Sequence, residues 1–165
     1  AGGRKALFAL DNLWDGIGGL IATDPTVKYL SGKVTIYSTS PEMSRKAMVY
    51  YLDMSFGDRE GLITSKNPET CTPEQAAFFK EMFTGADYKE NYAILNNYVK
   101  SLGDTIPPFI HLYIGLSPTM KTFGTTFDPD FGDCYDTAMI ITAADIYPDK
   151  YKRYVESYEK CKVRK

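Results

Sequence analysis

The sequence predicts a mixed α/β domain, with a mixed sheet of at least three strands and about five flanking helices. In several segments apolar residues recur at spacings of three and four, the period of a helix with one buried face. Other segments alternate between β-branched and polar residues, which is typical of strands. The 165 residues are 44% hydrophobic and 14% aromatic, enough for the core of one domain, which we place over residues 1–165.

The first elements are a helix and a strand. The helix carries one predicted apolar stripe, formed by Leu7, Leu10, Leu13, Trp14, Ile17 and Leu20. Thr23-Asp24-Pro25 ends this helix, because the residue before a proline disfavours helical backbone. The segment Lys33–Thr39 alternates and predicts a strand with Val34 and Ile36 on one face.

Local capping signals place the next elements. A helix is predicted to reach Met54, with Ser40 as its N-cap and Pro41 in its first turn. Residues 55–73 contain several glycines and prolines and are predicted to form a loop. Thr72-Pro73-Glu74-Gln75 is a capping-box sequence, which starts another short helix.

Periodicity places the rest of the chain. The remaining predictions are helices over 88–102, 109–116 and 148–163, and strands over 120–127 and 137–142. Between the two strands, Asp128, Asp130 and Asp133 suggest calcium by composition. Their spacing lacks the bidentate glutamate of a calcium loop, so we predict a turn and no metal site there.

Charge and hydropathy exclude some classes of protein. The chain has 19 lysines and arginines against 21 aspartates and glutamates, with a pI near 5.5, which disfavours a nucleic-acid binder. No apolar stretch approaches the roughly 18 residues of a membrane span, and no signal peptide is recognisable. Residues 150–165 are rich in cations, so they form either a solvated terminal helix or a docking surface for an acidic carrier or an anionic membrane.

Cysteine and histidine usage also limits the chemistry. Cys71, Cys134 and Cys161 are far apart in sequence, and His111 is the only histidine. This disfavours a zinc site and a disulfide framework, and favours reduced thiols in a cytoplasmic protein. The alternative is a Cys134 nucleophile with His111 as its base.

The N-terminal segment and the helix after it hold further candidates. Gly2-Gly3-Arg4-Lys5, just before a predicted helix, is either a phosphate cradle or a flexible, solvated end. Asp11 and Asp15 lie four residues apart on one helix face and are either a carboxylate pair or a solvated face. His111, in an apolar helix, is either a general base or structural.

Several motifs, taken in order, resemble a known family. They are Gly3-Arg4-Lys5, Leu10–Gly16, Tyr29–Val34, Ile106-Pro107-Pro108 and Phe123–Gly132. Together they resemble the C-terminal part of a GNAT-superfamily acyltransferase, in the hemolysin-like branch that includes the N-acyltransferases of ornithine- and glycine-lipid synthesis. The resemblance implies a GNAT-like fold that lacks its N-terminal strands in this chain, with the missing half supplied by a further segment or a second chain.

The resemblance also implies a donor site. The backbone amides expected to hold the pantetheine pyrophosphate are those of Gly2, Gly3, Arg4, Lys5 and Ala6. The strand around Val34 and Ile36 would separate from its neighbour to admit the pantetheine arm. The donor, a co-substrate rather than a permanently bound cofactor, would be a coenzyme A or acyl-carrier-protein thioester. The acceptor would be an amine. The resemblance implies a cytoplasmic protein that can also lie at the inner face of the membrane.

Four side chains are candidates for proton transfer in such a reaction. Tyr37, Ser38 and Tyr113 are candidates to protonate the departing thiolate, and His111 is a candidate base for the amine. The alternative function is a non-catalytic module that recruits a partner through its basic C-terminal helix and an exposed sheet edge. An enzyme would release free thiol from an acyl thioester when an amine is present, whereas the module would not.

Overall fold

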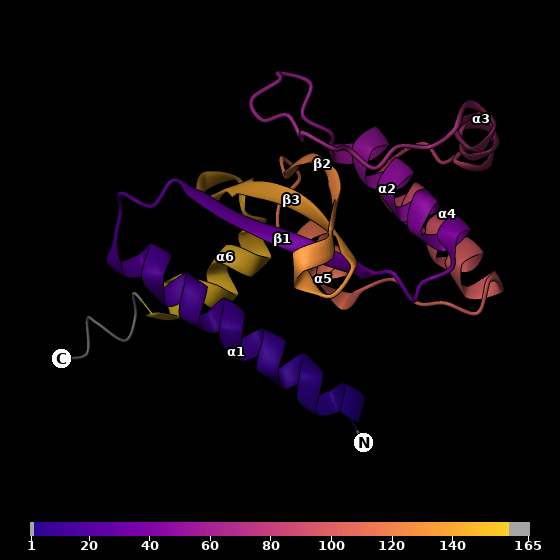
Figure 1. Cartoon of the computed structure of the whole chain (residues 1–165). Helices are drawn as coiled ribbons and strands as arrows, with labels where there is room; N and C mark the ends of the chain where they lie inside the picture. The colour runs from indigo at the N-terminus through magenta and orange to yellow at the C-terminus, as the bar shows by residue number, and fades with distance from the viewer. Residues whose placement is uncertain (1, 159–165) are drawn as a thin grey trace. The chain divides into compact units, whose positions relative to one another are not determined.

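A computed structural model describes the backbone of residues 2–158 and the side chains of residues 12–158 (Figure 1). The chain forms two compact units. The terminal unit comprises Ala1–Leu30, Gly115–Thr119 and Ile141–Lys165, and the central unit comprises Ser31–Ile114 and Met120–Ile140. Each unit is described in turn.

One three-stranded sheet supports the central unit. Its strands lie in the order β1 (Tyr29–Tyr37), β3 (Cys134–Thr142) and β2 (Lys121–Asp128), and β2 pairs antiparallel with β3. Helices flank this sheet, so the predicted mixed α/β class is confirmed. Among residues 2–158 no strand pairs with the outer edge of β1.

Two strands begin earlier than predicted, and β1 also ends earlier, at Tyr37 rather than Thr39. β1 begins at Tyr29 rather than Lys33, and β3 begins at Cys134 rather than Thr137. Cross-strand pairing explains the longer β3, because Cys134 pairs with Asp128 at the end of β2. The predicted turn between β2 and β3 is confirmed as a single 3-10 turn, η1 (Pro129–Phe131).

Four helices belong to the central unit. They are α2 (Glu42–Phe56), α3 (Pro73–Met82), α4 (Tyr88–Ser101) and α5 (Pro108–Ile114). The capping box of α3 is confirmed, since the Thr72 hydroxyl accepts from Gln75 N (3.2 Å) and the Gln75 side chain accepts from Thr72 N (3.0 Å). The predicted N-cap of α2 is wrong. Ser40 N donates to Tyr37 O in a preceding turn, and Pro41, which lacks a capping side chain, occupies the N-cap position.

Aromatic rings join α2 to α3 and α4. Tyr50 stacks on Phe83, with centroids 5.9 Å apart and ring planes within 5° of parallel. Tyr51 is fully buried beside Tyr92 and donates a hydrogen bond to Tyr88 O (2.8 Å). Because aromatic side chains bury large areas, these contacts fix α2 against its neighbours. α2 also packs on β2, and this holds it over one face of the sheet.

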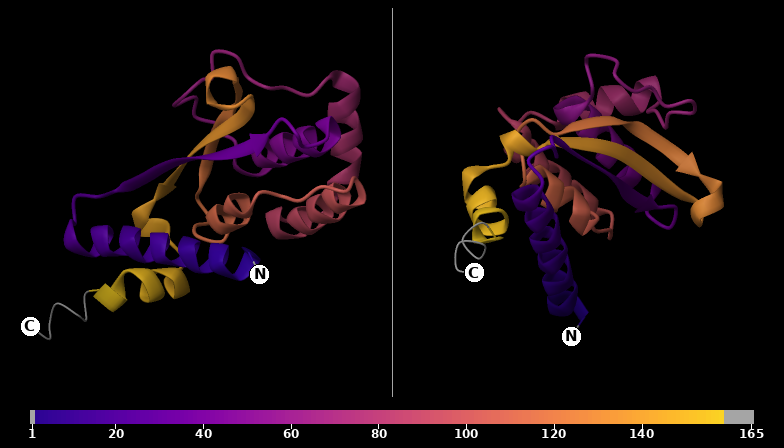
Figure 2. Two further views of the ribbon diagram at one scale, coloured as in Figure 1. Left: turned by 60° about the horizontal axis from the view of Figure 1, so that its bottom comes forward. Right: turned by 90° about the vertical axis from the view of Figure 1, so that its left-hand side faces the viewer.

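In the terminal unit, α1 (Gly2–Thr23) and α6 (Pro148–Tyr154) lie side by side (Figure 2). Close approach depends on Gly18, where an added Cβ would overlap the backbone carbonyl of Tyr154. Trp14 is buried, as expected for the apolar stripe, but Leu13 and Leu20 are about half exposed, so part of the predicted stripe is wrong.

In the terminal unit, α1 begins earlier than predicted and the C-terminal helix is interrupted by one turn. α1 begins at Gly2 rather than near Leu7, because Arg4, Lys5 and Ala6 favour helix strongly enough to offset the two glycines. It ends at Thr23, as predicted. α6 begins at Pro148 as predicted and reaches Tyr154; after a turn at Val155 the backbone is helical again over residues 156–158. The prediction for residues 159–163, like Cys161 and the last four cations, lies outside the described residues.

Candidate functional site

A cavity of about 340 Å³ lies in the central unit, between α2, the loop that follows it, and strands β2 and β3. Its size is at the lower end of small-molecule sites, which run from about 300 to 1,000 Å³. The lining residues come from α2 (Val49, Tyr50, Leu52, Asp53), the loop (Pro68, Glu69, Thr70, Cys71), α3 (Ala76), β2 (Thr122, Gly124, Thr125) and β3 (Thr137).

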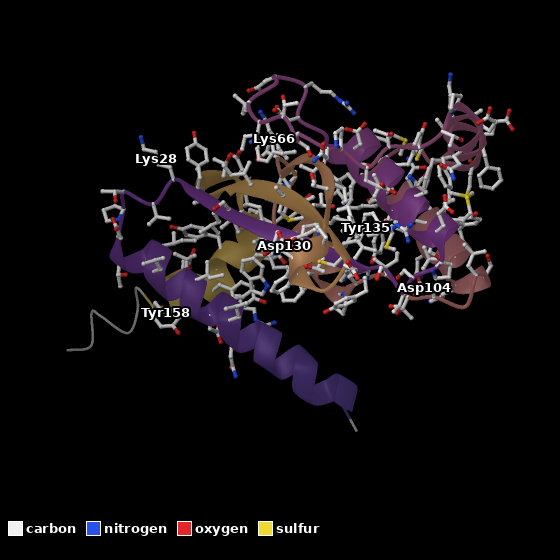
Figure 3. All side chains as sticks on the ribbon, viewed as in Figure 1. Lys28, Lys66, Asp104, Asp130, Tyr135 and Tyr158 are labelled. Atoms are coloured by element: carbon white, nitrogen blue, oxygen red, sulfur yellow. The ribbon has the colours of Figure 1, made fainter. Side chains whose placement is uncertain are left out.

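The loop over residues 57–72 is fixed to the outer edge of β2 at both ends. Asp58 N donates to Thr122 O (2.9 Å), and Glu69 N donates to Thr125 O (2.7 Å). The middle of the loop is exposed, and Lys66 marks it in Figure 3. Loops whose two ends are held close together in this way are compact and often functional. This one forms a wall of the cavity and we call it the cavity loop.

A β-bulge in β2 shapes the cavity floor. The register of β2 on β3 shifts between Thr122 and Thr125. Gly124 lies in this shift with φ +84°, a left-handed conformation that costs glycine little and other residues considerably more. The bulge therefore needs glycine at this position.

A buried ion pair joins α2 to the cavity loop. Lys46 Nζ lies 2.6 Å from Glu69 Oε1 and also donates to Thr70 O (2.5 Å), and the Lys46 side chain is only 11% exposed. Arg45 Nε lies 3.9 Å from the same Glu69 oxygen. The Arg45 guanidinium also covers the ring of Tyr135, labelled in Figure 3, at 4.2 Å from its centroid. Two cations thus balance the Glu69 carboxylate.

Threonine hydroxyls on the cavity floor are paired within the protein. Thr125 Oγ1 and Thr137 Oγ1 are 2.7 Å apart and fully buried, so they hydrogen-bond across β2 and β3. Thr122 Oγ1 donates to Leu52 O on α2 (3.3 Å). These hydroxyls are therefore satisfied within the protein and need no ligand as a partner.

The one cysteine in the cavity wall is half-buried. Cys71 Sγ lies 3.8 Å from Lys46 O. Burial raises the pKa of the Cys71 thiol above its ordinary value, although the Lys46 charge lowers it. A thiol held in its protonated form is a weak nucleophile, so this site does not resemble a cysteine-nucleophile site.

The predicted donor residues lie elsewhere. Gly2, Gly3, Arg4, Lys5 and Ala6 form the first turns of α1 instead of a loop, and their side chains lie outside the described residues. Their role toward a phosphate therefore stays a prediction.

Alternate residues of β1 face opposite sides of the sheet. Val34 and Ile36 are fully buried in the core. On the other face, Lys33 Nζ and Thr35 Oγ1 contact the Asp136 carboxylate at 2.5 and 2.6 Å. These side chains are committed to packing and pairing, so the edge of β1 offers a ligand chiefly its backbone groups.

The four proton-transfer candidates do not meet at the cavity. Tyr37 is 65% exposed at the end of β1, and Ser38 follows it in an exposed turn. His111 is exposed on α5, with its ring centroid 5.5 Å from that of Tyr92. Of these candidates, only Tyr113 is substantially buried.

Tyr113 lies against β1. An added Cβ at Gly32 would lie 2.7 Å from the Tyr113 hydroxyl oxygen, so a larger residue there would displace the phenol. Gly32 shares one face of β1 with Val34 and Ile36, because alternate strand residues point to the same side. Burial raises the pKa of the Tyr113 phenol, which keeps it protonated near neutral pH. The structure thus brings Tyr113 to the strand that the resemblance implicates in donor binding.

The other sequence candidates have structural roles where they are described. Cys134 is fully buried, and burial is the main cause of the raised pKa of its thiol, which argues against a nucleophile. Asp128 accepts a hydrogen bond from Asp130 N within its turn. Asp15 is half-buried, and the side chain of Asp11 lies outside the described residues. Within the side chains that the structure describes, no group of three or more His, Cys, Asp or Glu residues could hold a metal ion.

Sequence reasoning missed the cavity. Its residues come from a segment predicted as a loop and from helices and strands that are far apart in the sequence. No local sequence pattern indicates that these segments meet. The one available signal was Lys46, a cation directly before the apolar stretch Ala47–Leu52. A buried lysine requires a partner, but the sequence does not indicate that Glu69 supplies it.

In the described part of the chain, no helix is both long and apolar enough to cross a membrane.

Comparison with known proteins finds two curated relatives of similar sequence. A protein of Phocaeicola vulgatus named glycine N(alpha)-acyltransferase is 42% identical over 158 residues, which is 96% of this chain and 48% of that protein. A protein of Bacteroides thetaiotaomicron with the same name is 42% identical over 159 residues, covering 94% of this chain and 46% of that protein. The chain thus spans about half the length of the curated relatives it matches. No protein-family model and no solved structure matches.

Proposed function

We propose that this chain is part of an N-acyltransferase, which moves an acyl group from a thioester to an amine. One observation carries the proposal. Across nearly its whole length the chain is 42% identical to two proteins named glycine N(alpha)-acyltransferase. By the same likeness, the acceptor we propose is the α-amine of glycine.

The donor we propose is the thioester of coenzyme A or of an acyl carrier protein. The motifs that resemble the hemolysin-like GNAT branch support this choice. The three-stranded antiparallel sheet with flanking helices is compatible with such a fold. The first turn of α1 supports an anion site, because amides at a helix N-terminus attract phosphate groups.

The reaction has a simple atom balance. The amine nitrogen attacks the thioester carbonyl, the new C–N bond forms, and the C–S bond breaks. The nitrogen loses a proton, and the departing thiolate gains one. Orientation of the two substrates and backbone donors for the developing oxyanion supply most of the rate enhancement.

Tyr113 is the best-placed of the four candidates to donate the proton to the thiolate. Its phenol is half-buried against β1 and carries its proton at neutral pH. Tyr37, Ser38 and His111 are more exposed, so water competes with them for proton transfer.

Release of free thiol tests the proposal. The full chain is incubated with a coenzyme A thioester or an acyl-carrier-protein thioester, with and without glycine, and thiol is measured with a chromogenic disulfide. We expect release that depends on both protein and glycine. Glycolate, which replaces the amine by a hydroxyl, is the matched control and should give no increase. Thiol release that glycine does not change contradicts the proposal and favours a non-catalytic binding module.

A further inference from the structure

We propose that the cavity between α2 and the cavity loop binds the aliphatic chain of the acyl group. This inference rests on the proposed acyl transfer for the identity of its ligand. The argument for an apolar occupant comes from the cavity itself and has three steps: the wall, the pairing of its polar groups, and its volume.

The cavity wall is largely apolar. Val49 and Leu52 contribute aliphatic groups from α2, and Pro68 and Ala76 do so from the cavity loop and α3. The ring of Tyr50 lies on the same side and is itself fixed by stacking on Phe83. A hydrocarbon gains free energy on leaving water for such a surface.

The buried polar groups of the wall already have partners. Glu69 is balanced by Lys46 and Arg45, and the hydroxyls of Thr125 and Thr137 bond to each other. A charged or strongly polar ligand would lose its hydration without finding matching groups here, which is costly. A hydrocarbon loses no hydrogen bond on entry, so the wall favours it.

The volume fits part of an acyl chain. The cavity holds about 340 Å³, and one water occupies about 30 Å³ of liquid. A methylene group is of similar size to a water molecule, so about ten chain carbons fill the space. The cavity loop, fixed to β2 at Asp58 and Glu69, forms one of its walls. We therefore expect the cavity to limit the length of the acyl chain that binds fully within it.

Calorimetric titration with octanoate, decanoate, dodecanoate and tetradecanoate, each below its micelle concentration, tests the chain-length dependence. One buried methylene is worth about 0.8 kcal/mol, so affinity should rise about fourfold per methylene. The rise should stop once the cavity is full. Affinity that does not depend on chain length contradicts the proposal.

Two neighbouring alanines of α3 provide a matched pair of variants. Ala76 lines the cavity, whereas Ala77 is exposed. Ala76→Phe places a ring in the cavity and should weaken dodecanoate binding about tenfold or more, the loss of a few buried methylenes. Ala77→Phe should leave affinity within about twofold of wild type. Equal effects of the two variants contradict the proposal.

A measurement on the unaltered chain remains valid even if Ala76→Phe does not fold. Cys71 lines the cavity, so a bound chain should slow alkylation of its thiol by iodoacetamide, read by peptide mass spectrometry. We expect protection by dodecanoate and none by acetate. Alkylation of Cys71 at the same rate with and without dodecanoate overturns the proposal.

These readouts separate the inference from the proposed function. Binding and protection need no acyl transfer. Protection of Cys71 without glycine-dependent thiol release keeps the chain site and removes the transferase. Thiol release with no protection and no effect of Ala76→Phe on chain-length preference keeps the transferase and removes the chain site.

Discussion

Lys46 and Glu69 form a buried ion pair, 2.6 Å between Nζ and Oε1, that joins helix α2 to the loop over the cavity. Both side chains are largely removed from water, at 11% and 19% exposure. A buried charge that loses its partner is strongly destabilising, although the intact pair itself adds little. The pair therefore links the position of the cavity loop on α2 to the stability of the fold.

The first prediction is that Glu69→Gln destabilises the chain by about 3 kcal/mol, because it leaves the Lys46 ammonium buried without a countercharge. Urea unfolding measures the change. The control is Glu60→Gln, which removes the partner of Lys121 in an ion pair of the same length (2.6 Å), with Glu60 65% exposed. That variant should cost less than about 1 kcal/mol. Equal losses of unfolding free energy in Glu69→Gln and Glu60→Gln would show that burial of the Lys46–Glu69 pair does not affect stability.

The second prediction compares two glycines. Gly124 has φ +84° in the bulge of β2, so Gly124→Ala should destabilise by about 1–2 kcal/mol through backbone strain. Gly16 is exposed in α1 with open space around it, so Gly16→Ala should stabilise by about 1 kcal/mol. Urea unfolding of both variants measures the two signs. Stabilisation by Gly124→Ala would mean that the bulge does not need glycine.

The third prediction concerns alkaline pH. Burial raises the pKa of the Tyr51, Tyr92 and Tyr113 phenols above their ordinary value. Their folded-state pKa values thus exceed the unfolded value of about 10, and the folded chain keeps protons that the unfolded chain releases. The stability they contribute is complete below about pH 10. It is lost as pH rises from there through their folded-state pKa values.

The free energy of unfolding between pH 8 and 11 measures this loss. Tyr51→Phe removes the most buried of these phenols and should make the decline shallower. It should also cost about 1 kcal/mol at neutral pH, from the lost hydrogen bond to Tyr88 O. Tyr37→Phe controls for removal of a phenol from the surface. An unchanged decline in Tyr51→Phe would exclude this account.

The fourth prediction ranks the proton-transfer candidates under the proposed function. Tyr113→Phe should lower the rate of glycine-dependent thiol release by about a hundredfold or more, as expected when a general acid is removed. Tyr37→Phe, Ser38→Ala and His111→Gln, which change exposed side chains, should each stay within about threefold. Gly32→Ala should mimic Tyr113→Phe, since its Cβ would displace the phenol. A large loss confined to His111→Gln would move the role to that residue.

Local sequence signals predicted much of the fold. The capping box at Thr72 and the helical period over Tyr88–Ser101 both act within a few residues, and both elements occur. Ser40 is not the N-cap because α2 begins one residue later, with Pro41 in the cap position, and the glycines at the N-terminus did not prevent helix formation. In both places the preference of a single residue did not decide where the helix begins.

The cavity could not be predicted in the same way. The Lys46–Glu69 pair and the Thr125–Thr137 contact join residues whose proximity depends on the packing of α2 and on the bulge at Gly124. No periodicity or motif encodes that arrangement. The approach of Tyr113 to Gly32 is equally non-local, and so the sequence left Tyr113 among several equal candidates.

Product analysis with ¹⁵N-labelled glycine tests the central proposal most directly. The full chain is incubated with an acyl thioester and labelled glycine, and the mixture is examined by mass spectrometry. The account predicts N-acylglycine that carries the label, in an amount equal to the thiol released. Free fatty acid as the product, with no labelled amide, would contradict it.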